Sequence, residues 1–340
     1  MIQDARVLKQ AYLPQELHHR EQYLNMLSVA LDPLTDCERG EHVLIDGPSG
    51  AGKTTLARFA CSRLEESTFG VRIAEANAIS HSSPTRYLNA LCRDANLALD
   101  VSPDSAPVSA YIDRITARDE QLVAIVDEAD QMDDSQVWSL LDQPNVTVIA
   151  VCIDATDLLA HVDQRVASRL RGTMHLNLSG YTSAQLEDIL RGRIQHGLAP
   201  GSVAIEATET IADRAAGDAR FAIAMLRSAV RQADARGETV TAELVEETTD
   251  HARQGLRDRV VEQLGSHQRV LWHIIDEEGS VRAEALHNEY ERRVSEPKSK
   301  RMRRNYLRSL EQYGLIQGKG TGRATRYNRG DEGTTATAGN

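Results

Sequence analysis

The feature that most constrains this chain is a loop of sequence Gly-Pro-Ser-Gly-Ala-Gly-Lys-Thr, residues 47–54. The apolar run HVLI (42–45) ends one residue before the loop, and the helical stretch TLARFACSRL follows it directly. A strand, a glycine-rich loop and a helix N-terminus in this order are typical of a phosphate-binding loop, whose backbone N–H groups surround phosphate oxygens. A turn of purely structural use is the alternative, and the flanking strand and helix count against it.

The loop predicts a site for ATP or ADP with Mg²⁺. The ammonium of Lys53 is expected to reach the β- and γ-phosphates, and the hydroxyl of Thr54 to bind Mg²⁺. Thr55 adds an expected contact to the α-phosphate. The predicted nucleotide-binding residues of the loop are Gly47, Pro48, Ser49, Gly50, Ala51, Gly52, Lys53, Thr54 and Thr55.

A second element follows the apolar run LVAIV (122–126), which delivers Asp127 and Glu128 at its end. Two carboxylates after a buried strand are a weak pattern alone, because such positions are often exposed turns. Downstream of a phosphate-binding loop they indicate a Walker B element. Asp127 is then expected to support Mg²⁺, and Glu128 to polarise the attacking water as a base.

The spacing of apolar residues predicts three folded parts. Further apolar runs, VRIAEA (71–76), VTVIAVCI (146–153) and MHLNL (174–178), alternate with amphipathic segments, which predicts a doubly wound α/β domain with a parallel sheet over residues 1–178. Residues 179–255 carry Leu, Ile and Ala at three- and four-residue spacing, which predicts a small all-helical domain with N-caps at Ser183 and Thr241.

The last part, residues 256–329, shows three helical segments and then two short arms around a glycine-rich turn, which predicts a winged-helix module. The tail 330–340 has almost no apolar content and is expected to be disordered.

Charge is distributed unevenly along the chain. The net charge is −11, yet residues 251–329 hold 17 Lys and Arg against 10 Asp and Glu, and the rest holds 22 against 40. A basic module in an acidic protein favours double-stranded DNA as a partner, although a charged helix can be a solvated face and a winged helix can dock protein. The predicted DNA-binding residues are Lys298, Lys300, Arg301, Arg304 and Arg308 on a basic helix, and Lys319, Arg323 and Arg326 on the hairpin.

Composition limits the cellular compartments in which the protein is expected. Only five of the 39 cationic residues are lysine, which suits either a high-salt cytoplasm or a GC-rich genome. The four cysteines have no metal-binding spacing, and the longest apolar runs are far shorter than a membrane span. We therefore expect a cytoplasmic, nucleoid-associated protein with no membrane partner.

Several segments together resemble a known family. YLPQELHHRE before the loop, VDEAD, RVASRLRG, GYTSAQLEDIL and GDARFAIAMLRSAV occur in the order and spacing of the archaeal ORC-type DNA replication initiators. These are AAA+ ATPases related to the eukaryotic origin-recognition and cell-division-cycle loaders. The resemblance runs from about Tyr12 to Tyr327, and it implies an AAA+ domain, a helical lid and a C-terminal winged helix.

The resemblance also implies roles for individual residues. Arg220, in GDAR, resembles the sensor 2 arginine that reaches from the lid to the γ-phosphate. Arg165 and Arg169 resemble the segment that supplies an arginine finger to a neighbouring subunit, and the choice between them stays open. Pro14, Leu17 and Arg20 resemble the N-terminal box that packs near the adenine.

Two segments depart from the family pattern. Asp154 stands where the family usually has a sensor 1 asparagine, and a carboxylate there would repel the γ-phosphate unless it is protonated or bound to metal. Slow or atypical hydrolysis is therefore expected. The segment 97–115 occupies the place of a helical insertion that touches DNA in the family, but it carries little positive charge.

The leading functional interpretation is an initiator that binds origin DNA, self-associates on it and helps to recruit the replicative helicase. The first alternative is a divergent paralogue that acts as a DNA-binding regulator or plasmid-maintenance factor with little ATP turnover. The second is an ATP-dependent adaptor whose winged helix docks protein.

Overall fold

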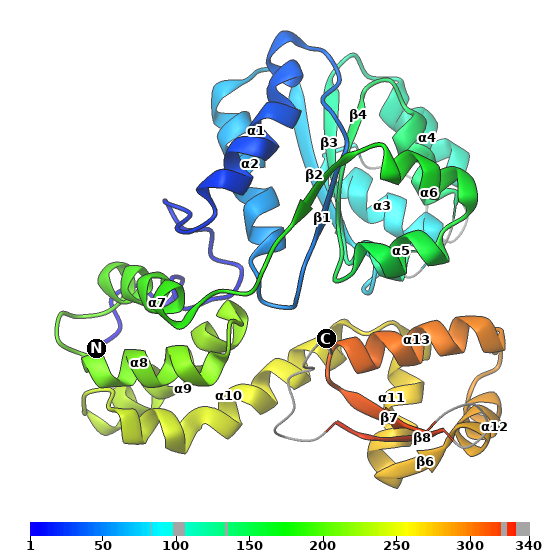
Figure 1. Ribbon diagram of the computed structural model, residues 1–340. Coiled ribbons are helices and arrows are strands. Elements are labelled where there is room, and N and C mark those ends of the chain that lie inside the picture. Colours follow the sequence, from blue (N-terminus) through cyan, green and yellow to red (C-terminus); the bar gives the residue numbers. More distant parts are fainter. Residues whose placement is uncertain (82, 98–105, 133–134, 321–324, 331–340) are drawn as a thin grey trace. The chain divides into compact units, whose positions relative to one another are not determined.

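The structure is a computed structural model that describes residues 1–340 except 82, 98–105, 133–134, 321–324 and 331–340 (Figure 1). The chain divides into two compact units, Met1–Ala252 and Arg253–Asn340. The predicted disordered tail, residues 330–340, lies outside the described residues except for Gly330, which is buried and whose amide donates to the Leu315 carbonyl at 3.0 Å, so the prediction of disorder is wrong for that residue. Residues 98–105 of the segment 97–115 also lie outside the described residues.

A five-stranded parallel sheet forms the centre of the first unit. Its strand order is β2-β3-β4-β1-β5. The predicted apolar runs become these strands: β1 (Val43–Asp46), β2 (Val71–Asn77), β3 (Gln121–Asp127), β4 (Val146–Val151) and β5 (Met174–Asn177). All residues of β1 and β4 are buried, which explains why these runs are continuously apolar rather than alternating.

Helices cover both faces of the sheet, as the doubly wound prediction requires (Figure 1). Two core clusters result, because successive strand residues such as Leu44 and Ile45 point to opposite faces. One face carries α1 (Glu21–Leu31) and α2 (Lys53–Ser67). The other carries α3 (Pro84–Asp94), α4 (Val108–Thr116), α5 (Ala155–His161) and α6 (Gln164–Arg171). Short 3₁₀ turns lie at Asp32–Asp36, Ala129–Gln131 and Val137–Asp142.

Four helices follow the sheet: α7 (Ser183–Gly197), α8 (Ile205–Ala215), α9 (Ala219–Arg236) and α10 (Ala242–Gln263). The predicted N-cap at Ser183 is wrong, because Thr182 caps α7. The Thr182 hydroxyl accepts from the Gln185 amide at 3.3 Å, and the Gln185 side chain accepts from the Thr182 amide at 3.0 Å. A glutamine three residues after the cap selects Thr182 through this capping box. The predicted cap Thr241 does accept from the Leu244 amide, at 3.3 Å.

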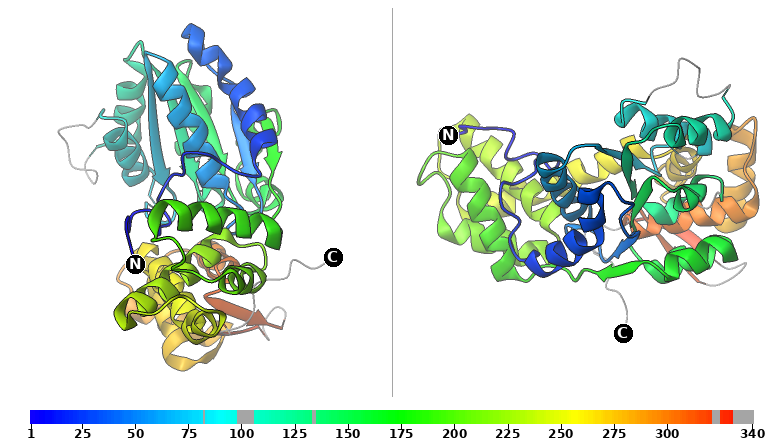
Figure 2. Two further views of the ribbon diagram at one scale, coloured as in Figure 1. Left: turned by 90° about the vertical axis from the view of Figure 1, so that its left-hand side faces the viewer. Right: turned by 90° about the horizontal axis from the view of Figure 1, so that it is seen from above.

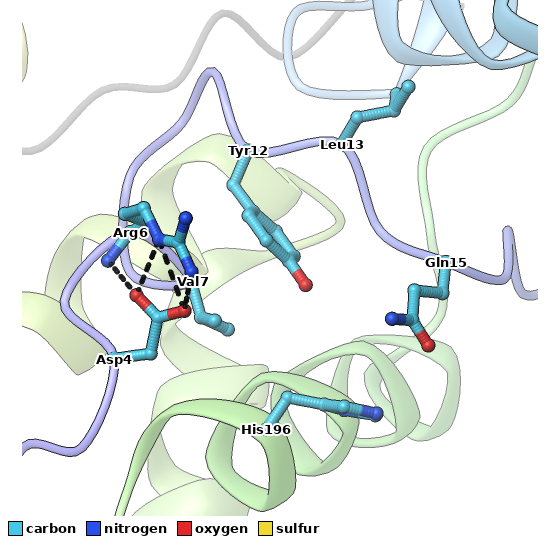
Figure 3. Close-up of a pocket in the computed structure, with 7 residues that line it drawn as sticks. All are labelled: Asp4, Arg6, Val7, Tyr12, Leu13, Gln15 and His196. Carbon is cyan, nitrogen blue, oxygen red and sulfur yellow. Dashed lines mark hydrogen bonds and ion pairs between the residues drawn. The ribbon is translucent and has the colours of Figure 1, made fainter.

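The N-terminal segment, residues 1–12, runs along these helices and not along the sheet (Figures 1 and 2). The amides of Gln3 and Asp4 donate to the Gly197 carbonyl at 2.9 and 3.0 Å. The buried guanidinium of Arg193, on α7, donates to the carbonyls of Val7 and, at 3.0 Å, Lys9. A pocket of about 430 Å³ lies between this segment and α7 (Figure 3), lined by Asp4, Arg6, Val7, Tyr12, Leu13, Gln15 and His196.

The second unit contains α11 (Ser266–Glu278), α12 (Ala283–Arg293) and α13 (Lys300–Gln312). Its antiparallel sheet has the order β6-β8-β7, with β6 (Ser280–Arg282), β7 (Ile316–Lys319) and β8 (Arg326–Arg329). The three helices and the hairpin lie where the sequence predicts them. Strand β6 was not predicted, because three residues are too few to show a period. None of the described helices is long and apolar enough to cross a membrane.

His42 gives the first unit a predicted dependence on pH. Its Nδ1 accepts from the Val148 amide at 3.0 Å, so its Nε2, 3.1 Å from the Leu141 carbonyl, carries the proton. Burial lowers the pKa of His42 below its ordinary 6.5. The folded state therefore resists protonation, and its stability is complete above pH 6.5 and falls as the pH drops below it.

Thermal unfolding between pH 8 and pH 5.5 tests this. We expect the slope of Tm against pH to flatten in His42→Gln but not in the exposed-histidine control His18→Gln. Equal slopes in all three proteins would show that acid acts elsewhere.

Candidate functional site

The glycine-rich loop lies at the carboxyl end of β1 and leads into α2. The Lys53 ammonium donates to the carbonyls of Gly47 and Pro48 at 2.7 and 2.8 Å, across the mouth of the loop. Burial lowers the pKa of Lys53, the charge of Glu128 raises it and the charge of Arg220 lowers it. The charges of the other two predicted functional side chains, Glu128 and Arg220, thus both act on Lys53.

Thr54, at the start of α2, and Asp127, at the end of β3, meet at the carboxyl end of the sheet. They do so although β4 lies between β3 and β1, the strand that precedes the loop. The Thr54 hydroxyl donates to Asp127 Oδ1 at 2.9 Å. Hydroxyl and carboxylate oxygens are ligands that Mg²⁺ prefers, so the pair fits this ion. The described residues contain no group of three His, Cys, Asp or Glu that could hold a metal. Phosphate and water oxygens would therefore have to complete the Mg²⁺ shell.

Asn77 belongs to this edge and was missed by the sequence interpretation. Its amide donates to Asp127 Oδ2 at 3.2 Å, so it orients the carboxylate that faces Thr54. Asn77 is in register with Asp127 at the ends of β2 and β3. The sequence does show a polar residue, Asn77, directly after the apolar run 71–76. It does not show which strands pair, so the contact between Asn77 and Asp127 could not be predicted.

Glu128 is the first residue after β3, and it is half-buried. Its backbone is left-handed, with φ 54° and ψ 46°. A residue other than glycine in this region costs free energy, and such residues concentrate at functional sites. The position is the one at which the sequence predicts a general base, and that role stays a prediction.

Asp154, the residue at the expected sensor 1 position, is the N-cap of α5. It is exposed, and its Oδ1 accepts from the amides of Thr156 and Asp157 at 2.7 and 3.2 Å. A helix N-terminus stabilises a negative charge, so this carboxylate is accommodated without a cation.

Two substitutions separate the cap from the charge. Asp154→Asn keeps a capping oxygen and removes the charge, so we expect tighter ATP binding at nearly unchanged stability. Asp154→Ala removes both and is expected to cost about 1 kcal/mol of unfolding free energy. Denaturant titration and ATP titration measure the two effects, and unchanged ATP affinity in Asp154→Asn would show that the carboxylate does not oppose the phosphates.

The N-terminus of α9, which carries Arg220, rests on the glycine-rich loop. The Ala219 amide donates to the Gly50 carbonyl at 3.2 Å, and Asp218 caps the helix by accepting from the Phe221 amide at 2.9 Å. Gly50 has a φ of +72°, and a Cβ there would lie 1.9 Å from Asp218 Oδ1. The loop thus needs glycine both for its backbone and for this contact. Arg220, half-buried, is the second residue of the helix.

The N-terminal box residues occupy different environments. Pro14 is half-buried, and Leu17 packs against the core beneath α1 and α2. Arg20 is 3% exposed and donates to the Ala51 carbonyl of the loop from Nε at 3.2 Å and from Nη2 at 3.0 Å. Their contact with an adenine stays a prediction.

Arg165 and Arg169 both pair with Asp142, which the sequence interpretation missed. Arg165 Nη2 lies 2.9 Å from Asp142 Oδ2, and Arg169 pairs with the other oxygen. The Arg165 side chain is 74% exposed and that of Arg169 is 42% exposed, so Arg165 has the greater access to a neighbouring molecule. Asp142 is 23 residues from Arg165, a separation that no local pattern connects.

The basic helix α13 has one buried apolar face and one exposed basic face. Tyr306, Leu307 and Leu310 are buried, and Met302 and Tyr313 are half-buried. The predicted DNA-binding residues that the structure describes are all exposed: Lys298, Lys300, Arg301, Arg304, Arg308, Lys319 and Arg326. Arg323 lies outside the described residues.

Arg303, which the sequence interpretation did not place, belongs to the core of the second unit. It is 2% exposed, and its guanidinium donates to the His287 carbonyl at 3.1 Å and to Glu291 Oε1 at 2.7 Å. It therefore fixes α13 to α12 and does not belong to the exposed basic face.

Comparisons with known proteins fit this arrangement. Residues 37–162 match the AAA domain family, and residues 187–250 match the Cdc6 AAA+ ATPase-type lid domain. The ORC1 protein of Aeropyrum pernix, solved in complex with DNA, has a TM-score of 0.76 at 24% identity and covers 97% of this chain and 94% of its own. This likeness supports the α/β and lid architecture.

Two full-length relatives carry the assignment to a family. ORC1-type DNA replication protein 9 of Halobacterium salinarum is 34% identical over 330 residues, which are 96% of this chain and 93% of that protein. ORC1-type DNA replication protein 1 of the same organism is 36% identical over 308 residues, which are 90% of this chain and 100% of that protein. The chain therefore belongs to the family of ORC1-type DNA replication proteins, which are AAA+ ATPases.

Proposed function

We propose that this protein is an ATP-dependent DNA replication initiator that binds origin DNA through its C-terminal unit and helps to recruit the replicative helicase. One observation carries the nucleotide-dependent part: helix α9, with Arg220 at its start, rests directly on the phosphate-binding loop at Gly50. Whatever occupies the loop is therefore in reach of the helical lid. The recruitment of a helicase rests on the family resemblance.

In this proposal the loop residues Gly47–Thr55 bind the phosphates of ATP. Lys53 lies ready to exchange its two backbone carbonyl partners for phosphate oxygens, since charge-assisted hydrogen bonds are stronger than those to carbonyls. Thr54 and Asp127 would hold Mg²⁺, which neutralises charge on the phosphates. Glu128 accepts a proton from the attacking water.

Hydrolysis is proposed to be slow and to serve regulation. Arg220 bonds the γ-phosphate while ATP is bound and loses that partner after hydrolysis. The arrangement in which the helical lid lies against the nucleotide is then less stable with ADP than with ATP. Arg165 or Arg169 contributes a finger to the nucleotide of a neighbouring copy on DNA. Hydrolysis then depends on assembly, because the finger acts on the nucleotide of another copy. Either arginine must first break its ion pair with Asp142.

The C-terminal unit is proposed to be a winged helix that binds duplex DNA. The exposed lysines and arginines of α13 can bond guanine edges or phosphates in the major groove, and those of the hairpin suit the minor groove or the backbone. The ORC1 protein of Aeropyrum pernix was solved with DNA, which supports the same partner here.

Charge reversal of Arg301 and Arg304 tests the DNA partner. A good contact of this kind contributes about 1–3 kcal/mol, so Arg301→Glu with Arg304→Glu is expected to weaken duplex binding about thirtyfold or more. Fluorescence anisotropy at one fixed salt concentration measures this, with duplexes first selected by the wild-type protein from a random pool.

The control for that experiment is Arg292→Glu, which changes an arginine on α12 whose side chain is 76% exposed and pairs with Glu289. It is expected to bind DNA as the wild type does. If the double variant also binds normally, the adaptor interpretation, in which this unit docks protein, replaces the DNA proposal.

A second candidate function is favoured by the carboxylate of Asp154. A protein with an acid at this position can bind ATP and DNA with little turnover and act as a regulator or plasmid-maintenance factor. Such a protein binds the selected duplex, hydrolyses almost no ATP with or without that duplex, and leaves replication unchanged when its gene is deleted.

A further inference from the structure

Arg20 is a buried cation whose partners are unusual. Buried charges are ordinarily paired with an opposite charge. Arg20 instead donates to the carbonyl oxygens of His19, Ala51 and Ser179. Its guanidinium carbon also lies 3.8 Å from the centroid of the Tyr181 ring. The planar fork of an arginine is suited to several simultaneous acceptors and to stacking, which a lysine ammonium is not.

These partners belong to separate segments. His19 precedes α1, Ala51 lies within the glycine-rich loop, and Ser179 and Tyr181 lie in the connection between β5 and α7. The bond to Ser179 is 2.7 Å and the shorter bond to Ala51 is 3.0 Å. One side chain therefore holds the phosphate-binding loop against the connection that leads to the lid.

The same connection touches the start of α9. The Tyr181 amide donates to the Gly217 carbonyl at 3.0 Å, three residues before Arg220. Gly52, with a φ of +86°, lies so close to Tyr181 that a Cβ there would be 2.5 Å from the phenol oxygen. Contacts thus run without a break from Arg20 through Tyr181 and Gly217 to the helix that carries Arg220.

We propose that Arg20 is a positioning residue that locks the glycine-rich loop to the lid connection and so sets the distance between Arg220 and the γ-phosphate. The inference rests on the proposed function, because the sensor role of Arg220 is part of that proposal. It replaces the expectation that Arg20 packs near the adenine. Arg20 then affects ATP and ADP differently, since only ATP has the phosphate that Arg220 reads.

The test is the preference for ATP over ADP, measured as the ratio of their dissociation constants by displacement of a fluorescent ADP analogue from the full-length protein. Arg220→Ala is expected to lower this preference about tenfold. Arg20→Lys keeps the charge but cannot hold all its acceptors, and it is expected to lower the preference by a similar factor. The preference of the double variant for ATP is expected to be no lower than that of Arg220→Ala alone.

Arg193 provides a matched control. It is also a buried arginine that donates to backbone carbonyls, at Val7 and Lys9, and its guanidinium lies 5.3 Å from the centroid of the Tyr12 ring. It ties the N-terminal segment to α7, and its hydrogen bonds within the described residues go to that segment and not to the glycine-rich loop. Arg193→Lys is expected to lower Tm about as much as Arg20→Lys while leaving the nucleotide preference unchanged.

The outcomes separate the two proposals. If Arg20→Lys weakens ATP and ADP equally while Arg220→Ala changes the preference, Arg20 packs on the nucleoside and this inference is wrong. Additive effects in the double variant overturn it as well. If Arg220→Ala leaves the preference unchanged, the sensor role in the proposed function is lost, and this inference with it. Should Arg20→Lys fail to fold, Tyr181→Leu removes the stacked ring and is expected to shift the preference in the same direction.

Discussion

Glu128→Gln is expected to lower ATP hydrolysis by about 10²–10⁴-fold while ATP binding stays near that of the wild type. Glutamine has nearly the shape of glutamate, but it cannot accept a proton from water. The residue follows β3 directly, in a left-handed backbone conformation that only a surrounding fixed structure maintains. A loss confined to turnover would thus identify Glu128 as a group that acts in the transition state.

Single-turnover release of phosphate and a separate ATP titration measure the two quantities. Glu65→Gln is the control, because Glu65 is an exposed glutamate on α2. Since the wild-type rate is expected to be low, the comparison is best made with saturating duplex DNA present. Wild-type turnover in Glu128→Gln would mean that no general base at this position contributes to hydrolysis.

Lys53→Ala is expected to weaken ATP binding at least about a hundredfold, because a hydrogen bond to a charged group contributes about 1.5–3 kcal/mol and Lys53 is expected to reach two phosphates. The ammonium already lies across the loop mouth, bound to Gly47 and Pro48. Alanine leaves those carbonyls accessible to water, so the cost to stability is expected to be small. Isothermal titration with ATP, beside Tm, measures both effects.

Lys9→Ala serves as the control for this variant, because Lys9 is an exposed lysine of the N-terminal segment. It should bind ATP like the wild type. Tight ATP binding by Lys53→Ala would show that the backbone amides of the loop suffice and that the lysine has another role.

The parts of the fold that the sequence predicts are those encoded by neighbouring residues. The apolar runs become the five strands, of which β1 and β4 are buried along their whole length, and helical spacing locates the lid. The glycine-rich loop can be recognised because all its phosphate-binding groups lie within one segment. The misplaced cap at Ser183 has a local cause too, since Thr182 and Ser183 both favour the N-cap and only Gln185 distinguishes them.

The parts that the sequence could not predict depend on contacts between distant residues. Asn77 orients Asp127 across two strands, and Asp142 binds both finger candidates from another element. Arg303 looks like its exposed neighbours on a basic helix, yet it is buried against Glu291. Arg20 was recognised by resemblance, but its bonds to Ala51 and Ser179 emerge only when three segments meet.

The most direct test of the central claim is genome-wide occupancy of the tagged protein, recorded together with a marker-frequency profile of replication in wild-type and deletion strains. The account predicts occupancy at a replication peak that disappears when the gene is deleted. Occupancy at promoters, with a replication profile that deletion leaves unchanged, would contradict an initiator and support a regulator.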